Sequence, residues 1–126
     1  MSYHFNEDEG KTIGVDFDGV IHKSSLGFHD GTVYDEPIDG SLEAIKQLSK
    51  KYKIVVYSAK ARPDRPLVNN KTGIELIKEW LIKHDIFQYV QEVTAIKPRA
   101  LFYIDDRAIT FESWPQVMGE LSEKNY

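Results

Sequence analysis

The chain contains no cysteine among its 126 residues. Without thiols it has no disulfide, no thiolate zinc site and no cysteine nucleophile. Any bound metal must therefore be held by oxygen or imidazole ligands. The 20 acidic residues outnumber the four histidines, which favours oxygen ligands.

The sequence also lacks a strong charge excess and a long hydrophobic run. Its net charge is −4 and 41% of its residues are hydrophobic, which argues against a disordered acidic chain and against a binder of long duplex nucleic acid. No apolar run reaches the roughly 18–20 residues of a membrane span, and the polar segment 1–11 has no apolar signal core. We expect a cytoplasmic protein without membrane contact, with a flexible arm over residues 1–11 and one domain over residues 12–126.

Short apolar runs and helical patterns alternate along this domain. Three runs are typical of buried strands and a fourth is weaker, at residues 12–17, 53–58, 100–105 and 92–95 respectively. Apolar residues recur at helical spacing after Gly40 and after Thr72, and Thr72 with Glu75 fits a capping box. The pattern predicts the order β-α-β-α-β-β-α. We expect a Rossmann-like α/β fold, an open parallel sheet with helices on both faces.

Two connections are longer than plain turns. Residues 20–40 contain Gly27 and Gly31 around a turn-like centre, which predicts a small hairpin flap. Residues 59–71 carry four cations against one acid, a local net charge of +3, in Lys60, Arg62, Arg65 and Lys71 against Asp64. Long loops after strand ends often carry functional sites, and Lys60 and Arg62 are the candidate contacts for substrate phosphates.

The first strand ends in two carboxylates, Asp16 and Asp18, followed by Gly19. Side chains two residues apart on a strand lie on the same face, so the two carboxylates are expected to share one pocket. Their repulsion must be offset by a shared proton or by a cation, for which Mg²⁺ is a natural candidate. A solvated Asp-Gly turn is the alternative interpretation.

A second strand ends in the adjacent acids Asp105 and Asp106. The carboxyl ends of parallel strands lie at one edge of a sheet, so either acid can approach Asp16 and complete a magnesium site. The two acids also fit a plain acidic cap on the segment that follows them.

Two further polar residues fit a phosphate site. Ser58 ends the middle strand, where a hydroxyl and nearby backbone amides can bind a phosphate oxygen, and Lys97 can supply a cation to the same phosphate. An ordinary strand-end serine and a solvated surface lysine are the alternatives.

In their order along residues 12–114, these elements resemble the four motifs of the haloacid dehalogenase superfamily of phosphotransferases. Asp16 and Asp18 look like the first motif, Ser58 like the second, Lys97 like the third, and Asp105-Asp106 like the fourth. The chain is similar to small members without a large cap, among them phage and bacterial hydrolases and the phosphatase domain of polynucleotide kinase-phosphatases. Lys60 stands where those relatives often carry Arg.

The resemblance implies that Asp16 attacks a phosphoryl group while Asp18 serves first as acid and then as base. Mg²⁺ is then held by Asp16, the carbonyl of Asp18 and Asp105, with Asp106 as a further candidate ligand. For the first half-reaction, Asp18 is expected to be protonated in the free protein.

The expected partner is a phosphorylated small molecule, a nucleotide or a nucleic-acid end, because the predicted loops leave the site open and the basic loop can hold additional phosphates. A sugar phosphatase is one alternative. A phosphate-receiving signalling domain or a binding protein is another, although the receiver family places its acidic pair first and a lone aspartate in mid-chain.

The acidic pair at the end of the second strand yields a prediction. Asp105→Asn is expected to raise the Mg²⁺ concentration required for activity more than Asp106→Asn does, because the resemblance places the first acid of the pair on the ion. Titration of phosphatase activity against Mg²⁺ measures this, and a larger effect at Asp106 would reverse the assignment.

Overall fold

The computed structural model describes residues 11–105, 109–110 and 112–124. Its strands are β1 (Thr12–Asp16), β2 (Lys53–Tyr57), β3 (Val90–Thr94), β4 (Phe102–Asp105) and β5 (Ile109–Thr110). Its helices are α1 (Ser41–Leu48), α2 (Gly73–Lys83) and α3 (Trp114–Lys124), with short 3₁₀ turns η2 (Ala59–Ala61) and η3 (Phe87–Tyr89). The predicted alternation is confirmed, and β5 is an addition to it. Asp106 and nearly all of the predicted arm lie outside the described residues.

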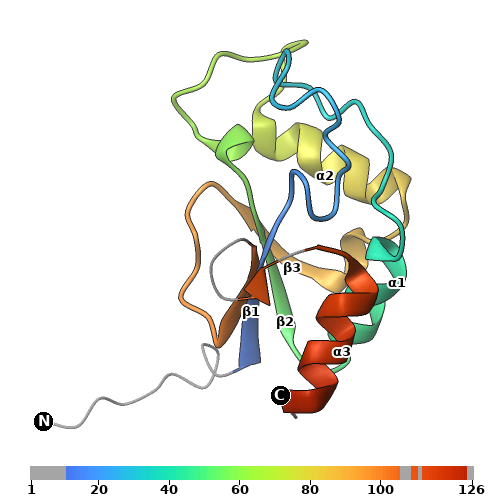
Figure 1. Ribbon diagram of the computed structural model, residues 1–126. Helices are drawn as coiled ribbons and strands as arrows, with labels where there is room; N and C mark the ends of the chain where they lie inside the picture. The colour runs from blue at the N-terminus through green and yellow to red at the C-terminus, as the bar shows by residue number, and fades with distance from the viewer. Residues whose placement is uncertain (1–10, 106–108, 111, 125–126) are drawn as a thin grey trace, which may run out of the picture.

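The strands form one parallel sheet in the order β3-β2-β1-β4-β5 (Figure 1). The strands that follow β1 in the sequence are therefore added first on one side of it, as β2 and β3, and then on the other side, as β4 and β5. The order of the strands reverses at β1. Asp16 pairs in register with Tyr57, and Val15 with Ile104, so that Asp105 is level with Asp16. In open α/β sheets, ligands bind beyond the carboxyl ends of the strands at such a switch point.

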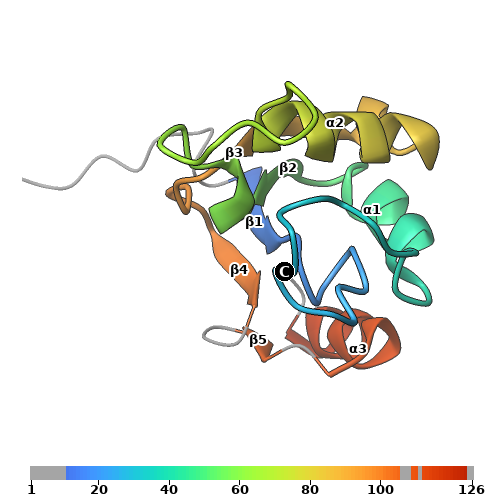
Figure 2. The same cartoon turned by 90° about the horizontal axis from the view of Figure 1, so that it is seen from above.

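All three helices pack on one face of the sheet, which corrects the prediction of helices on both faces. One hydrophobic cluster joins Ile45 of α1, Leu81 of α2 and Val117 of α3 to alternate strand residues such as Val15 and Val56. Figure 2 shows the helices on one side of the strands and the loop of residues 95–101 on the other.

Chain length explains this asymmetry. The loop 95–101 joins β3 to β4, which lie three strand spacings apart, or about 14 Å, and must also return along the length of the strands. Seven extended residues reach about 24 Å, whereas the same residues in a helix would span only about 11 Å. The connection therefore crosses the face as a nearly extended chain and has no residues to spare for a helix.

Side chains of this loop and of the strands fill the space above Gly14. A Cβ atom at Gly14 would lie 2.8 Å from Tyr103, 3.2 Å from Pro98 and 3.2 Å from Tyr57. The close approach of these rings to the backbone requires glycine here. The face without helices is therefore covered by a thin layer of aromatic and proline side chains.

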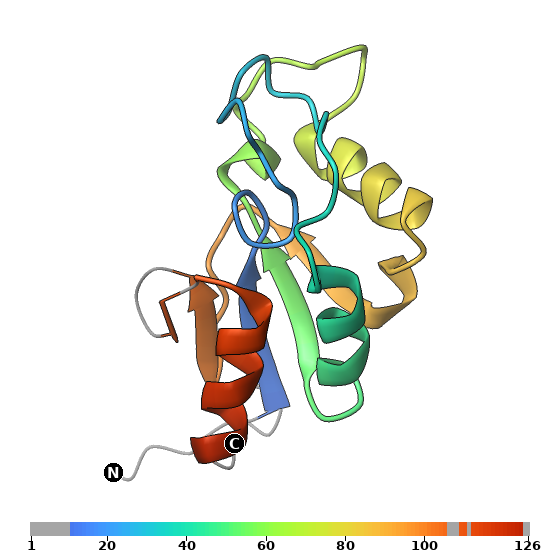
Figure 3. The same cartoon turned by 45° about the vertical axis from the view of Figure 1, so that its right-hand side comes forward.

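The segment between β1 and α1 forms no strand hairpin, contrary to the prediction for residues 20–40. It begins with a tight turn in which the amides of Val20, Ile21 and His22 all point to the Phe17 carbonyl, with Gly19 at a φ of +83°. Single bridges pair His22 with Asp18 and with Pro37. Figure 3 shows this flap beside the loop that follows β2.

The start of α2 fixes the loop after β2. Thr72 and Glu75 form the predicted capping box. Gly73, the first residue of the helix, packs so closely against η2 that a Cβ atom there would lie 1.6 Å from the Lys60 carbonyl oxygen. No helix of the described residues is long and apolar enough to cross a membrane.

We expect Gly73→Ala to destabilise the protein by about 1–3 kcal/mol, because the methyl group meets backbone that can move only with the start of α2. Gly119→Ala in α3 is the matched control, since no atom lies within 4 Å of its Cβ position and the better helix propensity of alanine should raise stability by up to about 1 kcal/mol. Urea unfolding measures both, and equal effects would contradict the close packing of α2 on Lys60.

Candidate active site at the carboxyl edge of the sheet

Asp16 and Asp105 end neighbouring strands at the same level of the sheet. Because parallel strands lie about 4.8 Å apart, these two side chains start within reach of one small ion. Asp105 is only 4% exposed, and Asp16 is half-buried. The sequence prediction that an acid after β4 approaches Asp16 is in agreement with this register.

Asp105 is held by groups on the face without helices. The Lys97 ammonium lies 2.7 Å from its Oδ2, and the Tyr57 hydroxyl donates to the same oxygen. The ammonium also lies 4.1 Å from the centre of the Tyr103 ring. Lys97, expected to bind phosphate, therefore already neutralises a buried carboxylate, and Tyr57 is a contact that the sequence analysis missed.

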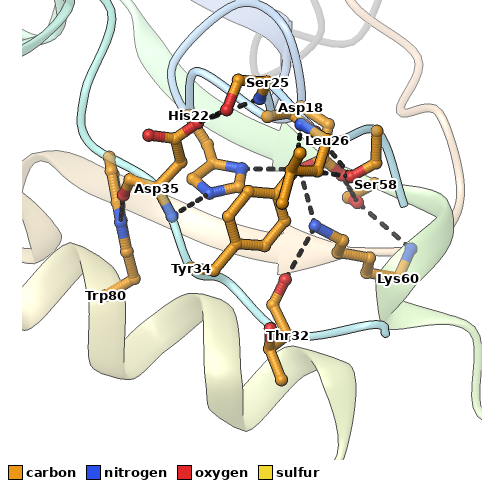
Figure 4. A network of polar contacts seen from close by, with 12 residues as sticks. Asp18, His22, Ser25, Leu26, Thr32, Tyr34, Asp35, Ser58, Lys60 and Trp80 are labelled. Atoms are coloured by element: carbon orange, nitrogen blue, oxygen red, sulfur yellow. Dashed lines mark hydrogen bonds and ion pairs between the residues drawn. The ribbon is translucent and has the colours of Figure 1, made fainter. Parts of the chain in front are cut away.

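The carboxylate of Asp18 is surrounded by donors from three segments. Its Oδ1 receives hydrogen bonds from His22 Nδ1 at 2.9 Å and from the Lys60 ammonium at 3.0 Å, and its Oδ2 receives one from Ser58 Oγ at 3.0 Å (Figure 4). Lys60 is 3% exposed and donates also to the carbonyl of Thr32 in the flap. A cation of the protein thus offsets the charge of Asp18.

These contacts set the protonation state of Asp18. Burial raises its pKa, but the hydrogen bond from His22, the charge and hydrogen bond of Lys60 and the hydrogen bond from Ser58 together lower it by more. The net pKa of Asp18 lies below its ordinary value. The expectation that Asp18 is protonated in the free protein is therefore wrong, because it counted only the neighbouring carboxylate and not the donors around the group.

Ser58 lies at the centre of this network. It precedes η2 as its N-cap, where its Oγ accepts from the Lys60 amide at 3.1 Å while donating to Asp18. The residue is 5% exposed. Ser58 therefore fixes the positions of both Lys60 and Asp18, and a phosphate oxygen would have to compete with Asp18 for its hydroxyl hydrogen.

The basic loop differs from the open cationic surface that the sequence suggests, because its charges have local partners. Lys60 is buried on Asp18, Arg62 pairs with Asp64 at 3.0 Å, and Lys71 pairs with Glu79 of α2 at 2.6 Å. The guanidinium of Arg65 lies 4.3 Å from the centre of the Phe28 ring of the flap. Arg62 remains 56% exposed and Lys71 42%, so these two cations of the loop are the ones that face solvent.

Two carboxylates and a backbone carbonyl are the oxygen donors that this edge offers to a metal. Among the described residues, no group of three or more His, Asp or Glu side chains is arranged to hold an ion. By their chemistry Asp16 and Asp105 are suitable ligands for Mg²⁺, since this ion takes one or two carboxylates and fills its other positions with water and phosphate oxygens. Asp106, the remaining predicted ligand, lies outside the described residues.

Comparison with protein-family models, with curated proteins and with solved structures gives no match. The interpretation of this edge therefore rests on its own residues and their geometry.

The flap provides a pH-dependent contact that can be tested. The side chain and amide of Ser25 and the amide of Glu36 hydrogen-bond to the Asp35 carboxylate and lower its pKa to about 2. Because the folded pKa is below the unfolded one, these contacts stabilise the flap above about pH 4 and are lost as the pH falls toward 2.

We expect Ser25→Ala to raise the pKa of Asp35 from about 2 toward its ordinary 3.8, because the hydroxyl makes the largest contribution to the shift. Titration of the Asp35 carboxyl carbon by NMR measures the change. Ser49→Ala, which removes a hydroxyl bonded to the Lys46 carbonyl in α1, is the control and should leave Asp35 unaffected. An Asp35 pKa that stays near 2 without the Ser25 hydroxyl would contradict this origin of the shift.

Proposed function

We propose that the protein is a Mg²⁺-dependent phosphomonoester hydrolase of the haloacid dehalogenase type that forms an aspartyl-phosphate on Asp16. The observation that carries this proposal is the meeting of Asp16, Asp18 and Asp105 at the carboxyl edge of the sheet, where the strand order reverses. Ser58 and Lys97 lie at the same edge and contact two of these acids. The resemblance of the four motifs gives each residue its role.

Bound Mg²⁺ would supply positive charge that offsets the negative charge of the phosphoryl group and of the carboxylates. Asp16, Asp105 and the carbonyl of Asp18 are the groups that would hold it. Lys97 and Tyr57 both contact Oδ2 of Asp105. Lys97 and Tyr57 would then orient Asp105, as outer partners orient metal-binding carboxylates elsewhere.

Two displacements at phosphorus complete the reaction. In the first, an oxygen of Asp16 bonds to phosphorus, the bond to the leaving oxygen breaks, and that oxygen takes a proton from Asp18. In the second, a water oxygen bonds to phosphorus, the bond to Asp16 breaks, and the water proton passes to Asp18. Phosphate leaves, and Asp16 is restored as a carboxylate.

The low pKa of Asp18 suits the second displacement directly, because the group is a carboxylate ready to take the water proton. For the first displacement, Asp18 must gain a proton when the substrate binds. A phosphomonoester has its second pKa near 6 and so carries such a proton in part of its population. Its negative charge also raises the pKa of a carboxylate beside it.

The open edge and the adjoining pocket favour a nucleotide or a nucleic-acid end as substrate. A pocket of about 170 Å³ lies between the flap and the loop after β2, and its lining includes Phe28, Lys60 and Arg65. Phe28 and the Arg65 guanidinium stack on each other in this lining, and a planar base would extend that stack. Lys60 joins this pocket to Asp18, so a ligand held there would extend from the reacting edge.

We expect Asp16→Asn to abolish turnover of phosphomonoesters while the fold is retained, because an amide supplies no nucleophile. The test is a Mg²⁺-dependent screen of nucleotides, sugar phosphates and 3′- or 5′-phosphorylated oligonucleotides. Asp85→Asn is the matched control: it removes a carboxylate at an exposed turn with a φ of +59°, which asparagine tolerates, and should remain active.

The other outcomes separate the alternatives. If sugar phosphates are the best substrates, the reaction stands and the substrate class is wrong. If Asp16 becomes phosphorylated but is not hydrolysed, the protein is a phosphate receiver. Full activity of Asp16→Asn would overturn the mechanism.

A further inference from the structure

His22 lies at the centre of the flap turn and was not singled out by the sequence motifs. It is fully buried, and its ring stacks on Phe17 with centroids 5.3 Å apart and an angle of 4° between the planes. The edges of Tyr34 and Trp80 pack against it at 5.2 and 5.7 Å. Aromatic rings on three sides fix the orientation of the imidazole.

The hydrogen bonds of His22 fix its tautomer. The backbone amide of Asp35 lies 2.9 Å from Nε2, and because an amide N–H only donates, Nε2 is the acceptor. The ring hydrogen is therefore on Nδ1, which lies 2.9 Å from Oδ1 of Asp18. His22 therefore donates a hydrogen bond to Asp18. The Asp35 amide of the flap determines this direction, because it occupies Nε2 as a donor and leaves the ring hydrogen on Nδ1.

The Asp35 amide is itself held in place from two directions. Its carbonyl accepts from the Trp80 indole of α2 at 2.9 Å, and its carboxylate accepts from the amide and hydroxyl of Ser25 in the other limb of the flap. Figure 4 shows the continuous series of contacts from Trp80 through Asp35 and His22 to Asp18. The orientation of Asp18 is thus linked to the conformation of the flap.

The two oxygens of Asp18 differ in how many hydrogen bonds they receive. Each carboxylate oxygen has two lone pairs. Those of Oδ1 face His22 and Lys60, whereas Oδ2 receives one hydrogen bond from the described residues, that of Ser58. The remaining lone pair of Oδ2 is the place where a proton from water can be accepted.

We propose that His22 is a positioning residue that holds Oδ1 of Asp18 and thereby aims Oδ2 at the reacting proton, so that the flap controls the acid-base group. This inference rests on the proposed phosphatase function for its kinetic consequence. The hydrogen bond and the tautomer are independent of that function. The experiment below therefore tests them separately.

Two substitutions of His22 each keep one of its two hydrogen bonds and remove the other. In His22→Asn, the amide nitrogen stands near the position of Nδ1 and keeps a donor for Asp18. In His22→Gln, the amide oxygen stands near Nε2 and keeps an acceptor for the Asp35 amide, but no donor faces Asp18. Both variants lose the ring packing, so their common loss of stability reports the structural role and their difference reports positioning.

We expect kcat of His22→Gln to be about ten- to a hundredfold below that of His22→Asn at similar KM, by analogy with the loss of activity when the outer partners of metal-binding side chains are removed. In His22→Gln, aspartyl-phosphate on Asp16 should accumulate, which quenching and mass spectrometry detect. Equal kcat values and equal amounts of intermediate in the two variants would overturn the positioning role.

Measurements that need no catalytic activity test the positioning role if the protein is not a phosphatase or if both variants unfold. In the parent protein, ¹⁵N NMR of the imidazole should show the hydrogen on Nδ1, and hydrogen on Nε2 would overturn the proposal whatever the activity. In folded variants, the Asp35 amide should exchange with solvent more slowly in His22→Gln, which keeps an acceptor for it, than in His22→Asn. If these two results hold while no phosphomonoester is hydrolysed, the contact stands and the proposed function fails.

Discussion

The ammonium of Lys60 meets the carboxylate of Asp18 in a place with little water, and most of the site depends on this contact. The same ammonium donates to the carbonyl of Thr32, so one charge joins the end of β1, the flap and the loop after β2. Removing one member of a buried pair commonly costs about 3–5 kcal/mol, because the other charge is left without compensation. Here Asp18 keeps a side-chain exposure of 28%, so the cost falls below that range.

The same contact explains why the ammonium of Lys60 is not an exposed surface charge. Its backbone is clamped from two sides, by the Ser58 hydroxyl on its amide and by Gly73 against its carbonyl. Its side chain is thereby directed inward to Asp18. A lysine here supplies a point charge and leaves the acid reachable from the edge, while Arg62, two residues later, points into solvent.

Much of the fold follows from patterns that the sequence displays directly. The apolar runs, the helical spacing after Gly40 and the Thr72 capping box are local signals, and each of them corresponds to an element of the structure. The error about the second face was avoidable, since the strands predicted at 92–95 and 100–105 leave only four residues between them, too few for a crossover helix. The loop could only be extended.

The candidate site was harder to predict, because its contacts cross between segments. The approach of Asp105 to Asp16 follows from parallel strands alone, and so could be foreseen. The partners of Asp18 could not, because His22 reaches it through a turn set by Gly19 and Lys60 reaches it through the clamp on η2. Helices and strands show a repeating hydrophobic pattern in the sequence, but these two turns do not, so the sequence does not indicate which side chains they bring together.

Asp18, two residues beyond the end of β1, and Asp105, the last residue of β4, are held by different parts of the structure. Asp105 meets Lys97 and Tyr57 on the face covered by the thin loop, far along the chain from the flap. Asp18 meets donors from the flap and from η2, and these two segments also line the pocket of about 170 Å³. A rearrangement of the flap or of Lys60 would therefore alter the surroundings of Asp18 without moving Lys97 or Tyr57, the partners of Asp105. Of these two acids, Asp18 is therefore the one whose described partners depend on the flap.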